Sequence, residues 1–537
     1  MIRPEELTTD APLVWSPGTG NSVWAIFTAA IAGDVPAIRQ LLAGDPALVR
    51  CHFHYRTPIY FAVRENQLSA AAFLLEHGAD PASLAVGDSL REITRDRGYA
   101  GMQRLLEDFF VNKYNISPLG DPVAAAIRRR EPLEAQALLD ASPALLHAGD
   151  QHGNQPIHWA VMTRQIEMID QLLIRGADIN ARRFDGARPI HLSNGDYNYR
   201  GWRDVPESVT AAPSEVLAHL IARGAYVDIW TACHQGNLAR VTELLDQDPS
   251  LVNRNSDYNS YYLGCGSPIR NAAAKGHIEI VKSLLARGAD PNLPEEGIAP
   301  HGHALYSAAA NGHYELAQLL LAHGANPNAA VESSADCLSR AISNEDQPMI
   351  DLLVSHGAQR SIEILAYYGD VAAAEARFAA DPSSANDPGA LANAAAESQD
   401  AFVHLMLRYQ PNLARRIAVT AKNPELTEFL FQQGMDPNHA DWLGVTRLHE
   451  FARRGDVERA TVFLNHGADP NVRDEDLGST PLAWAAKHGQ TEMVELLLSR
   501  GAKPRLPDDP PWATPVAWAR RRGHAQIVER LERESES

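Results

Sequence analysis

The amino-acid sequence predicts an all-α solenoid of about sixteen stacked helix-turn-helix repeats with short hairpin fingers between them. Three observations lead to this fold class. One motif recurs along the chain, and a glycine closes successive copies: Gly288, Gly324 and Gly357 lie 36 and 33 residues apart. The 537 residues, 45% of them apolar, exceed what one compact core normally holds. A stack in which each repeat packs only on its neighbours accommodates this length.

Each recurring position of the motif has a physical reason. Residues 267–292 carry one complete copy. A hydroxyl followed by proline opens a helix, because the hydroxyl caps free N–H groups and the ring fits the first turn. Paired alanines keep the inner helix thin, a Gly-His pair ends it, and a leucine pair faces the outer helix inward. The copy reads Ser267-Pro268-Ile269, Ala272-Ala273, Gly276-His277, Leu284-Leu285 and Gly288-Ala289-Asp290.

This motif resembles the ankyrin repeat, and near-copies open on Thr57-Pro58-Ile59 and Thr480-Pro481-Leu482. The resemblance covers roughly residues 23 to 533. It implies stacked inner and outer helices whose concave face recognises a partner. It implies no chemical reaction, because a fold does not by itself define a function.

The motif is irregular in places, and these irregularities predict how the chain is divided. From Gly176 to Gly224 is 48 residues, about 15 more than one repeat, so the sixth repeat carries an insertion. No spacer rich in Gly, Ser or Pro separates any two repeats, so we expect one unbroken array. The divisions are an N-terminal segment (1–22), two regular and two degenerate repeats (23–149), central repeats (150–360) with the insertion (194–213), degenerate repeats (361–438), C-terminal repeats (439–533) and a tail (534–537).

Charge and cysteine usage exclude several classes of protein. Lys and Arg number 48 against 67 Asp and Glu, a net charge of −19, so neither nucleic acid nor an anionic membrane is an expected partner. Four scattered cysteines without a CxxC pair predict free thiols in a reducing, cytoplasmic setting. An acidic N-terminus and the lack of 18 consecutive apolar residues predict neither a signal peptide nor a membrane span.

The central repeats contain aromatic and polar residues that the repeat itself does not need. Flat rings next to carboxylates, Arg and His suit either a protein-binding groove or a pocket for a polar, ring-shaped ligand. These candidate binding residues are His152, Trp159, Asp185, Arg188, His191, Tyr199, Trp202, Arg203, Tyr258, Tyr261, Tyr262, His301, His303 and Tyr306.

Two readings of these residues stay open. The first is recognition of a protein partner in the concave central groove. The second is binding of, or catalysis on, a small molecule such as a carbohydrate, with Asp196, Glu296 and Glu332 as acid and base of a hydrolase. We expect no cofactor. The His301-x-His303 and His52-x-His54 pairs would supply only two ligands each, so no metal site is predicted. A metal at His301 and His303 would need Glu296 or His191 to complete the set, and the sequence leaves this alternative open.

The insertion is predicted to form one wall of the main site. Asp196, Tyr199, Trp202 and Arg203 lie within eight residues, and nothing in the repeat requires them. We expect this loop to lean across the groove towards residues 258–262 and 295–303. The alternative is that it only fills the gap left by an interrupted inner helix.

Overall fold

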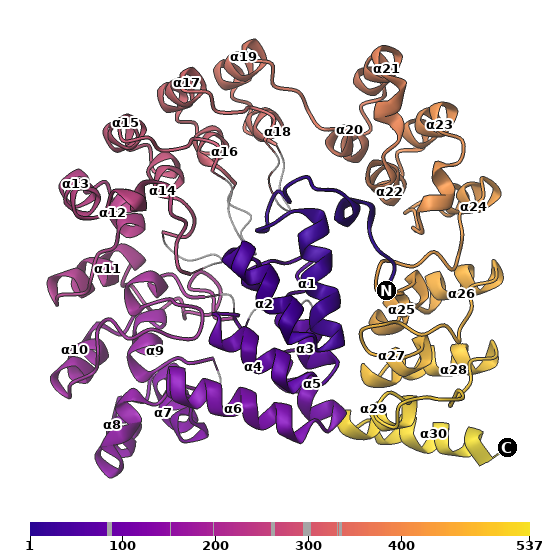
Figure 1. Cartoon of the computed structure of the whole chain (residues 1–537), viewed down its shortest axis with the longest axis horizontal. Coiled ribbons are helices and arrows are strands. Elements are labelled where there is room, and N and C mark those ends of the chain that lie inside the picture. Colours follow the sequence, from indigo (N-terminus) through magenta and orange to yellow (C-terminus); the bar gives the residue numbers. More distant parts are fainter. Residues whose placement is uncertain are drawn as a thin grey trace. The chain divides into compact units, whose positions relative to one another are not determined.

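The computed structural model describes residues 1–82, 88–150, 152–196, 198–258, 264–293, 302–329, 331 and 336–536. Within these ranges the regular elements are all helical, and extended residues form only isolated bridges. Thirty α-helices are present there, and most pair as an inner and an outer helix (Figure 1). The all-α repeat fold predicted from the sequence is confirmed.

The described residues form two compact bodies. The N-terminal body comprises Asp10–Ile93 and Ala100–Gln359. The C-terminal body comprises Arg360–Ser537 together with Met1–Thr9 and Thr94–Tyr99. The boundary after Gln359 coincides with the start of the degenerate repeats (361–438), and the unbroken array expected from the sequence stays a prediction. Each body has its own apolar core.

Most helices of the N-terminal body alternate between inner and outer positions, and only α5 extends into residues of the other body. They are α1 (Gly20–Ala32), α2 (Val35–Gly44), α3 (Pro58–Arg64), α4 (Leu68–Glu76), α5 (Leu90–Arg97), α6 (Ala100–Tyr114), α7 (Asp121–Arg128), α8 (Pro132–Ala141), α9 (Pro156–Met162), α10 (Ile166–Ile174), α11 (Pro213–Ala222), α12 (Ile229–Gln235), α13 (Leu238–Gln247), α14 (Pro268–Ala274), α15 (Ile278–Ala286), α16 (Ala304–Ala310), α17 (Tyr314–Ala322), α18 (Cys337–Ser343) and α19 (Gln347–Ser355).

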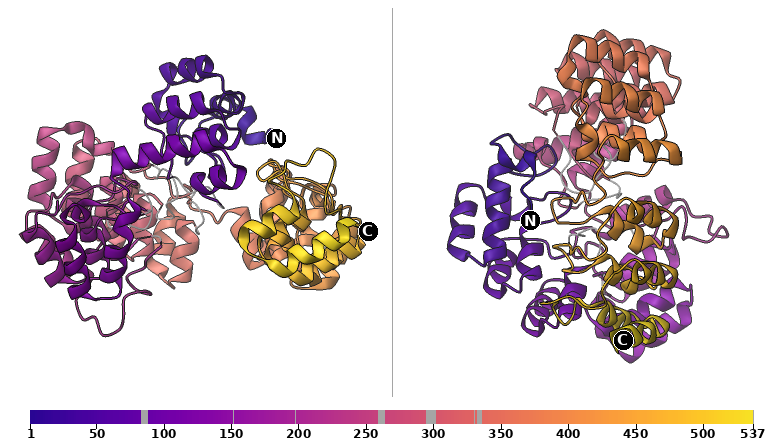
Figure 2. Two further views of the ribbon diagram at one scale, coloured as in Figure 1. Left: turned by 90° about the horizontal axis from the view of Figure 1, so that it is seen from below. Right: turned by 90° about the vertical axis from the view of Figure 1, so that its right-hand side faces the viewer.

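The C-terminal body is built mostly from helix pairs of the same kind, and Figure 2 gives two further views of the ribbon. Its helices are α20 (Ile362–Tyr368), α21 (Val371–Ala380), α22 (Pro388–Ala396), α23 (Asp400–Tyr409), α24 (Pro424–Gln432), α25 (Arg447–Arg454), α26 (Val457–Asn465), α27 (Pro481–Lys487), α28 (Thr491–Ser499), α29 (Pro515–Arg522) and α30 (Ala525–Glu536).

Two repeats lack a full inner helix. In the sixth, a short 3-10 helix, η5 (Pro189–Leu192), leads into the insertion before α11. In the thirteenth, η8 (Leu413–Arg416) precedes α24. The sequence predicted the first interruption from its extra length. The interruption in the thirteenth repeat was not predicted. Its signal is a short repeat: 23 residues separate the end of α23 (Tyr409) from the end of α24 (Gln432), against 33 from there to the end of α26 (Asn465).

The fingers are joined to one another by an asparagine ladder. The Asn292 side chain donates to the carbonyl of Gly324 at 2.9 Å and accepts the Asn326 N–H at 2.7 Å. Asn328 makes the same pair of bonds to Gly357 and Gln359. The final asparagine of the Gly-Ala-Asp-Pro-Asn motif therefore fixes each finger to the next repeat.

The four cysteines are buried free thiols, as predicted. Burial raises the pKa of the Cys337 thiol to about 12, so little reactive thiolate forms at neutral pH. None of the helices described by the structure is long and apolar enough to span a bilayer.

Candidate functional site

The candidate site is organised around Arg183, in the finger of the sixth repeat. Its side chain is only 2% exposed. The guanidinium donates to Asn154 Oδ1 at 2.7 Å and to Asp196 Oδ2 at 2.6 Å, and it forms a two-pronged pair with Asp185 at 2.7 and 2.8 Å. One buried cation thus joins the fifth finger, the sixth finger and the insertion.

Sequence reasoning named Asp185 and Asp196 but missed Arg183. Aligning the fifth and sixth repeats on Pro-Ile-His would have found it, because Arg183 then occupies the position of Asp150. An arginine in place of a finger aspartate reverses the charge at a buried position. Such a reversal requires neighbouring acceptors, and the structure supplies three.

In the fifth finger, Asp150 holds Trp159 in place. Its carboxylate accepts the Trp159 indole N–H at 2.7 Å and the backbone N–H groups of His152 and Asn154 at 2.8 and 3.0 Å. Trp159 is only 5% exposed. The structure therefore places this predicted binding residue in the packing of the repeat.

The repeat histidine of α9 stays neutral and bonds to the backbone. His158 Nδ1 accepts the Gln155 N–H at 3.0 Å, and Nε2 lies 3.0 Å from the carbonyl of Ala181 in the next finger. Burial, with the nearby charge of Arg183, lowers the pKa of His158 to about 4. The neutral tautomer with its proton on Nε2 satisfies both partners.

At the equivalent place in the sixth repeat, His191 bonds to a carboxylate instead of a carbonyl. Its Nε2 lies 2.9 Å from Asp228 Oδ2, and its ring stacks on Tyr258 with centroids 3.8 Å apart. Burial opposes ionisation of Asp228. The hydrogen bond and charge of His191 outweigh that effect, so the pKa of Asp228 lies below its usual value. Asp228 also caps α12 by accepting the Thr231 N–H at 2.8 Å.

Asp196 anchors the start of the insertion. Its second oxygen accepts the N–H groups of Asn198 and Tyr199 at 2.8 and 2.7 Å. Gly195 has a φ of +84°, and a Cβ there would lie 2.0 Å from the Tyr199 carbonyl, so the turn requires glycine. Asp196 is 3% exposed and bonded through both oxygens.

The described contacts of the insertion run to the fifth repeat. Most of the residues towards which we expected it to lean, 259–262 and 295–301, lie outside the residues that the structure describes. The Tyr199 ring meets Trp159 edge-on, with centroids 5.5 Å apart. The Arg164 guanidinium donates to the Gly201 carbonyl at 2.9 Å and to Asn194 Oδ1 at 3.3 Å. The loop lies back over α9 because the shortened inner helix leaves that face open.

The tip of the insertion faces solvent. Trp202 is 64% exposed, and the Arg200 guanidinium lies 5.2 Å from its ring centroid. Arg203 forms a 2.9 Å ion pair with Asp204, and both side chains are accessible. Of the predicted aromatic residues that the structure describes, Trp202 is the most exposed.

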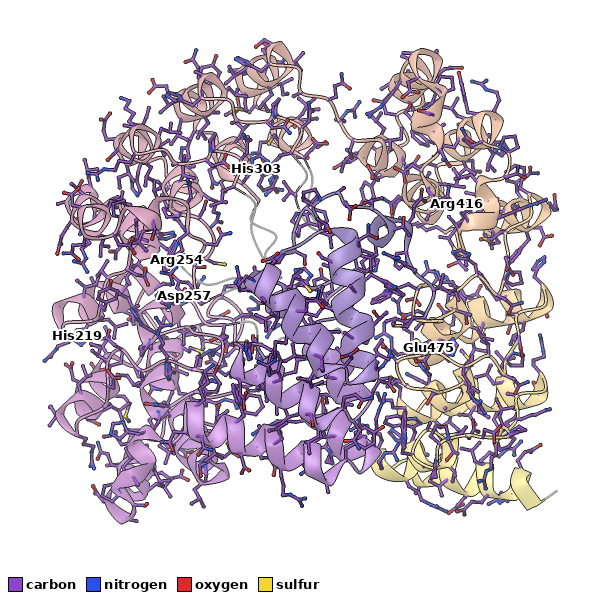
Figure 3. The ribbon with its side chains drawn as sticks, in the orientation of Figure 1. His219, Arg254, Asp257, His303, Arg416 and Glu475 are labelled. Carbon is purple, nitrogen blue, oxygen red and sulfur yellow. The ribbon has the colours of Figure 1, made fainter. Side chains whose placement is uncertain are left out.

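The remaining predicted residues lie apart from this cluster or outside the described ranges. His303 precedes α16 and is 3% exposed; burial lowers its pKa, and Tyr306 is buried in the same helix (Figure 3). Glu296, Glu332, Tyr261, Tyr262 and His301 lie outside the residues that the structure describes. Within the described residues, no group of three His, Cys, Asp or Glu side chains could hold a metal.

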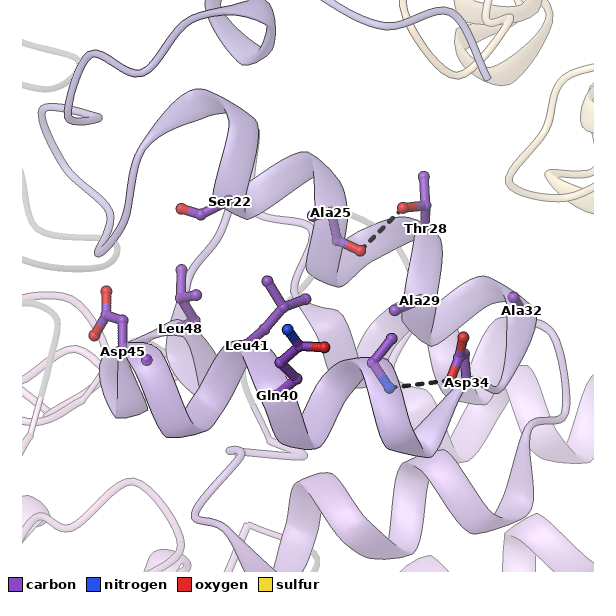
Figure 4. Close-up of a pocket in the computed structure, with 12 residues that line it drawn as sticks. Ser22, Ala25, Thr28, Ala29, Ala32, Asp34, Gln40, Leu41, Asp45 and Leu48 are labelled. Atoms are coloured by element: carbon purple, nitrogen blue, oxygen red, sulfur yellow. Dashed lines mark hydrogen bonds between the residues drawn. The ribbon is translucent and has the colours of Figure 1, made fainter.

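Away from the Arg183 cluster, a hollow lies on the first repeat, between α1 and α2 (Figure 4). It has a volume of about 700 Å³ and is lined mainly by small residues, among them Ala25, Ala29 and Ala37. This is the face on which a preceding repeat would stack. Its lining lacks a cluster of groups suited to chemistry.

Comparison with known proteins identifies the repeats. The family model "Ankyrin repeats (3 copies)" matches residues 269–364 and 416–508, and the model "Ankyrin repeat" matches residues 54–85 and 152–183. These matches lie in both bodies, and together with the helix pairs they account for the periodicity of the sequence.

Three relatives share part of this chain. The palmitoyltransferase ZDHHC13 of Mus musculus is 27% identical over 141 residues, which is 26% of this chain and 22% of that protein. The human transient receptor potential cation channel subfamily A member 1 is 28% identical over 151 residues, 28% of this chain and 12% of that protein. The probable E3 ubiquitin-protein ligase XBOS33 of Oryza sativa subsp. japonica is 34% identical over 76 residues, 14% of this chain and 15% of that protein.

The chain thus spans less than a quarter of the length of each of these relatives. Ankyrin repeats typically mediate protein binding. The chain belongs to the ankyrin repeat family.

Proposed function

We propose that this protein binds a protein partner through the insertion of the sixth repeat, with Trp202 as the anchor. The observation that carries the proposal is the 64% exposure of this tryptophan on an otherwise anchored loop. Tryptophan and arginine are the residues that most often dominate binding energy at protein interfaces. Arg200 beside the ring adds a cationic edge to the apolar surface.

The anchoring of the loop supports a recognition role. Asp196 is held by Arg183, and Arg164 clamps the carbonyl of Gly201 next to the tip. A loop held in one conformation before binding loses less conformational entropy when a partner docks. A loop that served only to fill the gap beside α9 would do so with Tyr199 and would have no use for an exposed Trp202.

Acid–base catalysis by Asp196 lacks comparable support. The carboxylate is 3% exposed, is ion-paired with Arg183 and accepts two backbone N–H groups. A general acid or base must reach the proton that it transfers, and these bonds occupy the oxygens of Asp196.

The test compares partners captured by the full-length protein and two variants, with quantitative mass spectrometry. Trp202→Ala removes the anchor, whereas Ile174→Ala removes an 85% exposed residue at the end of α10 and serves as the control. We expect at least one protein to be captured by the parent and by Ile174→Ala but lost with Trp202→Ala, with all melting temperatures equal. Capture of the same proteins by all three would contradict the proposal.

A further inference from the structure

We infer that a small cavity at the base of the sixth and seventh fingers binds the carboxylate group of a single-ring acid. The cavity has a volume of about 130 Å³ and lies wholly within the N-terminal body. Its polar lining comprises Arg182, Arg188, His191, Asp228, Arg254 and Asp257, and its apolar lining includes Tyr226, Trp230 and Tyr258. The inference is independent of the role proposed for Trp202.

Arg188 provides the main argument. Its guanidinium lies 4.8 Å from the centroid of the Tyr226 ring, which fixes its plane. Its Nη1 is buried and has no hydrogen-bond partner among the described residues. A buried donor without an acceptor is unfavourable, and more so when the group is charged. A ligand oxygen in the cavity would remove that cost.

The two carboxylates of the lining are already engaged. Asp228 accepts from His191 and from the N–H of Thr231. Asp257 lies 2.9 Å from the Arg254 guanidinium and 3.5 Å from that of Arg182, and Figure 3 shows Arg254 and Asp257 close together. Arg188 is therefore the guanidinium of this lining that forms no ion pair within the described residues.

The charge of the lining favours a singly charged anion. Three guanidiniums face two carboxylates, so the Arg and Asp side chains of the lining leave one net positive charge. A carboxylate matches that charge and the planar donor edge of Arg188. A phosphate dianion would bring a second negative charge close to Asp228 and Asp257, where repulsion opposes it.

The volume of the cavity and its aromatic lining define the part of the ligand beyond the carboxylate. Pockets for drug-sized ligands measure about 300–1,000 Å³, so this cavity holds one ring and not a sugar chain or a nucleotide. Tyr226, Trp230 and Tyr258 give the cavity an aromatic wall, which suits contact with a ring. The same chemistry is found in a free aromatic acid and in the C-terminal aromatic residue of a polypeptide.

Calorimetric titration of the full-length protein tests the inference. Benzoate represents the free acid and N-acetylphenylalanine the C-terminal residue, while benzamide and inorganic phosphate serve as neutral and dianionic comparisons. We expect one site for at least one of the two carboxylates, with a Kd on the order of 1 mM for so small a ligand. The tighter binder of the two identifies the source of the carboxylate. Benzamide and phosphate should bind at least about tenfold more weakly.

Variants locate the site. Arg188→Met should weaken carboxylate binding at least about tenfold, and Arg254→Met, at the exposed rim, should weaken it less. Arg203→Met, on the insertion and outside the lining, should leave it unchanged. Circular dichroism melting checks that each variant is folded, and Arg254→Met keeps the test decisive if Arg188→Met is not. Failure of both carboxylates to bind, equal binding by benzamide, preference for phosphate, or undiminished binding by the folded variants would overturn the inference.

Discussion

The fifth repeat and the C-terminal repeats around α27 use the same finger motif in different surroundings. Asp150 accepts the indole N–H of Trp159 at 2.7 Å, and Asp474 accepts that of Trp484 at 2.9 Å. In both regions a buried repeat histidine bonds to a carbonyl of the following finger, His158 to Ala181 and His449 to Ser479. The shared bonds identify this motif as part of the repeat framework.

The two regions differ in what joins one finger to the next. In the N-terminal body the link is ionic, because Arg183 bonds to Asn154, Asp185 and Asp196. In the C-terminal body the Ser479 hydroxyl donates to the Ala513 carbonyl and accepts the Trp518 indole N–H. An ion pair of 2.6 Å also joins Arg473 to Asp509 there, but its arginine is 33% exposed, whereas Arg183 is 2% exposed. Of these links, only the buried one made by Arg183 also holds an insertion.

Replacing Arg183 should have the largest effect on this comparison. Arg183→Met would leave two buried or half-buried carboxylates without their cation, and we expect a loss of about 3–5 kcal/mol in the free energy of unfolding. Urea denaturation measures the loss. Hydrogen exchange should show that it is concentrated in residues 183–204.

The matched control is Arg203→Met, which removes an exposed ion pair and should cost under about 1 kcal/mol. If both variants lose the same stability, the ionic link does not distinguish the two regions.

Acid should weaken the fifth repeat more than the repeats around α27. The pKa values of His158 and His449 are lowered by burial from 6.5 to about 4, so each side chain stabilises the fold above pH 6.5 and loses that contribution as the pH falls towards 4. The loss is about 3 kcal/mol for each histidine. Burial raises the pKa of Asp474 from 3.8 to about 6, which has the opposite sign. Protonation of Asp474 below pH 6 therefore offsets most of the loss from His449.

Hydrogen exchange at pH 7 and pH 4.5, corrected for the intrinsic exchange rate, measures this difference. We expect α9 to lose protection and α25 to retain most of its protection. Asp474→Asn removes the offset and should make α25 as acid-sensitive as α9. Equal sensitivity of the two helices in the parent protein would refute the expectation.

The indole bonds should contribute similarly in the two regions. Trp159→Phe and Trp484→Phe each remove one donor from a buried carboxylate while keeping an aromatic ring, and each should cost about 1–3 kcal/mol. Chemical denaturation of the two variants side by side measures the costs. A cost confined to one variant would show that the finger motif is not equivalent in the two bodies.

Trp202→Ala should have the smallest effect on stability. Its ring is largely exposed, so we expect the free energy of unfolding to change by no more than about 0.5 kcal/mol. Thermal melting measures it. A large drop in the melting temperature would mean that the insertion supports the stack through Trp202, and partner loss in this variant would then have a structural cause.

The repeat period, the helix pairs and the place of the insertion could be predicted from the sequence, because each depends on local residues such as Gly288 or the Ser267-Pro268 cap. The contacts of the insertion with the fifth repeat could not be predicted, because they depend on Arg164, which bonds to residues far away in the sequence. The repeat period also did not predict that Asp196 would form a buried ion pair with Arg183. Burial of Trp159 and His303 was missed because aromatic and polar residues serve packing and recognition alike.

The asparagine ladder also affects how the stack responds to pulling. Separating neighbouring fingers must break two bonds made by one side chain at each step, as at Asn253, Asn292 and Asn328. Asn438 and Asn471 repeat this arrangement further along the chain. Repeats joined by the ladder resist tension because each asparagine makes the same two hydrogen bonds to the next repeat. A stretching force should therefore first extend the degenerate repeats between them, and the laddered repeats should extend only at higher force.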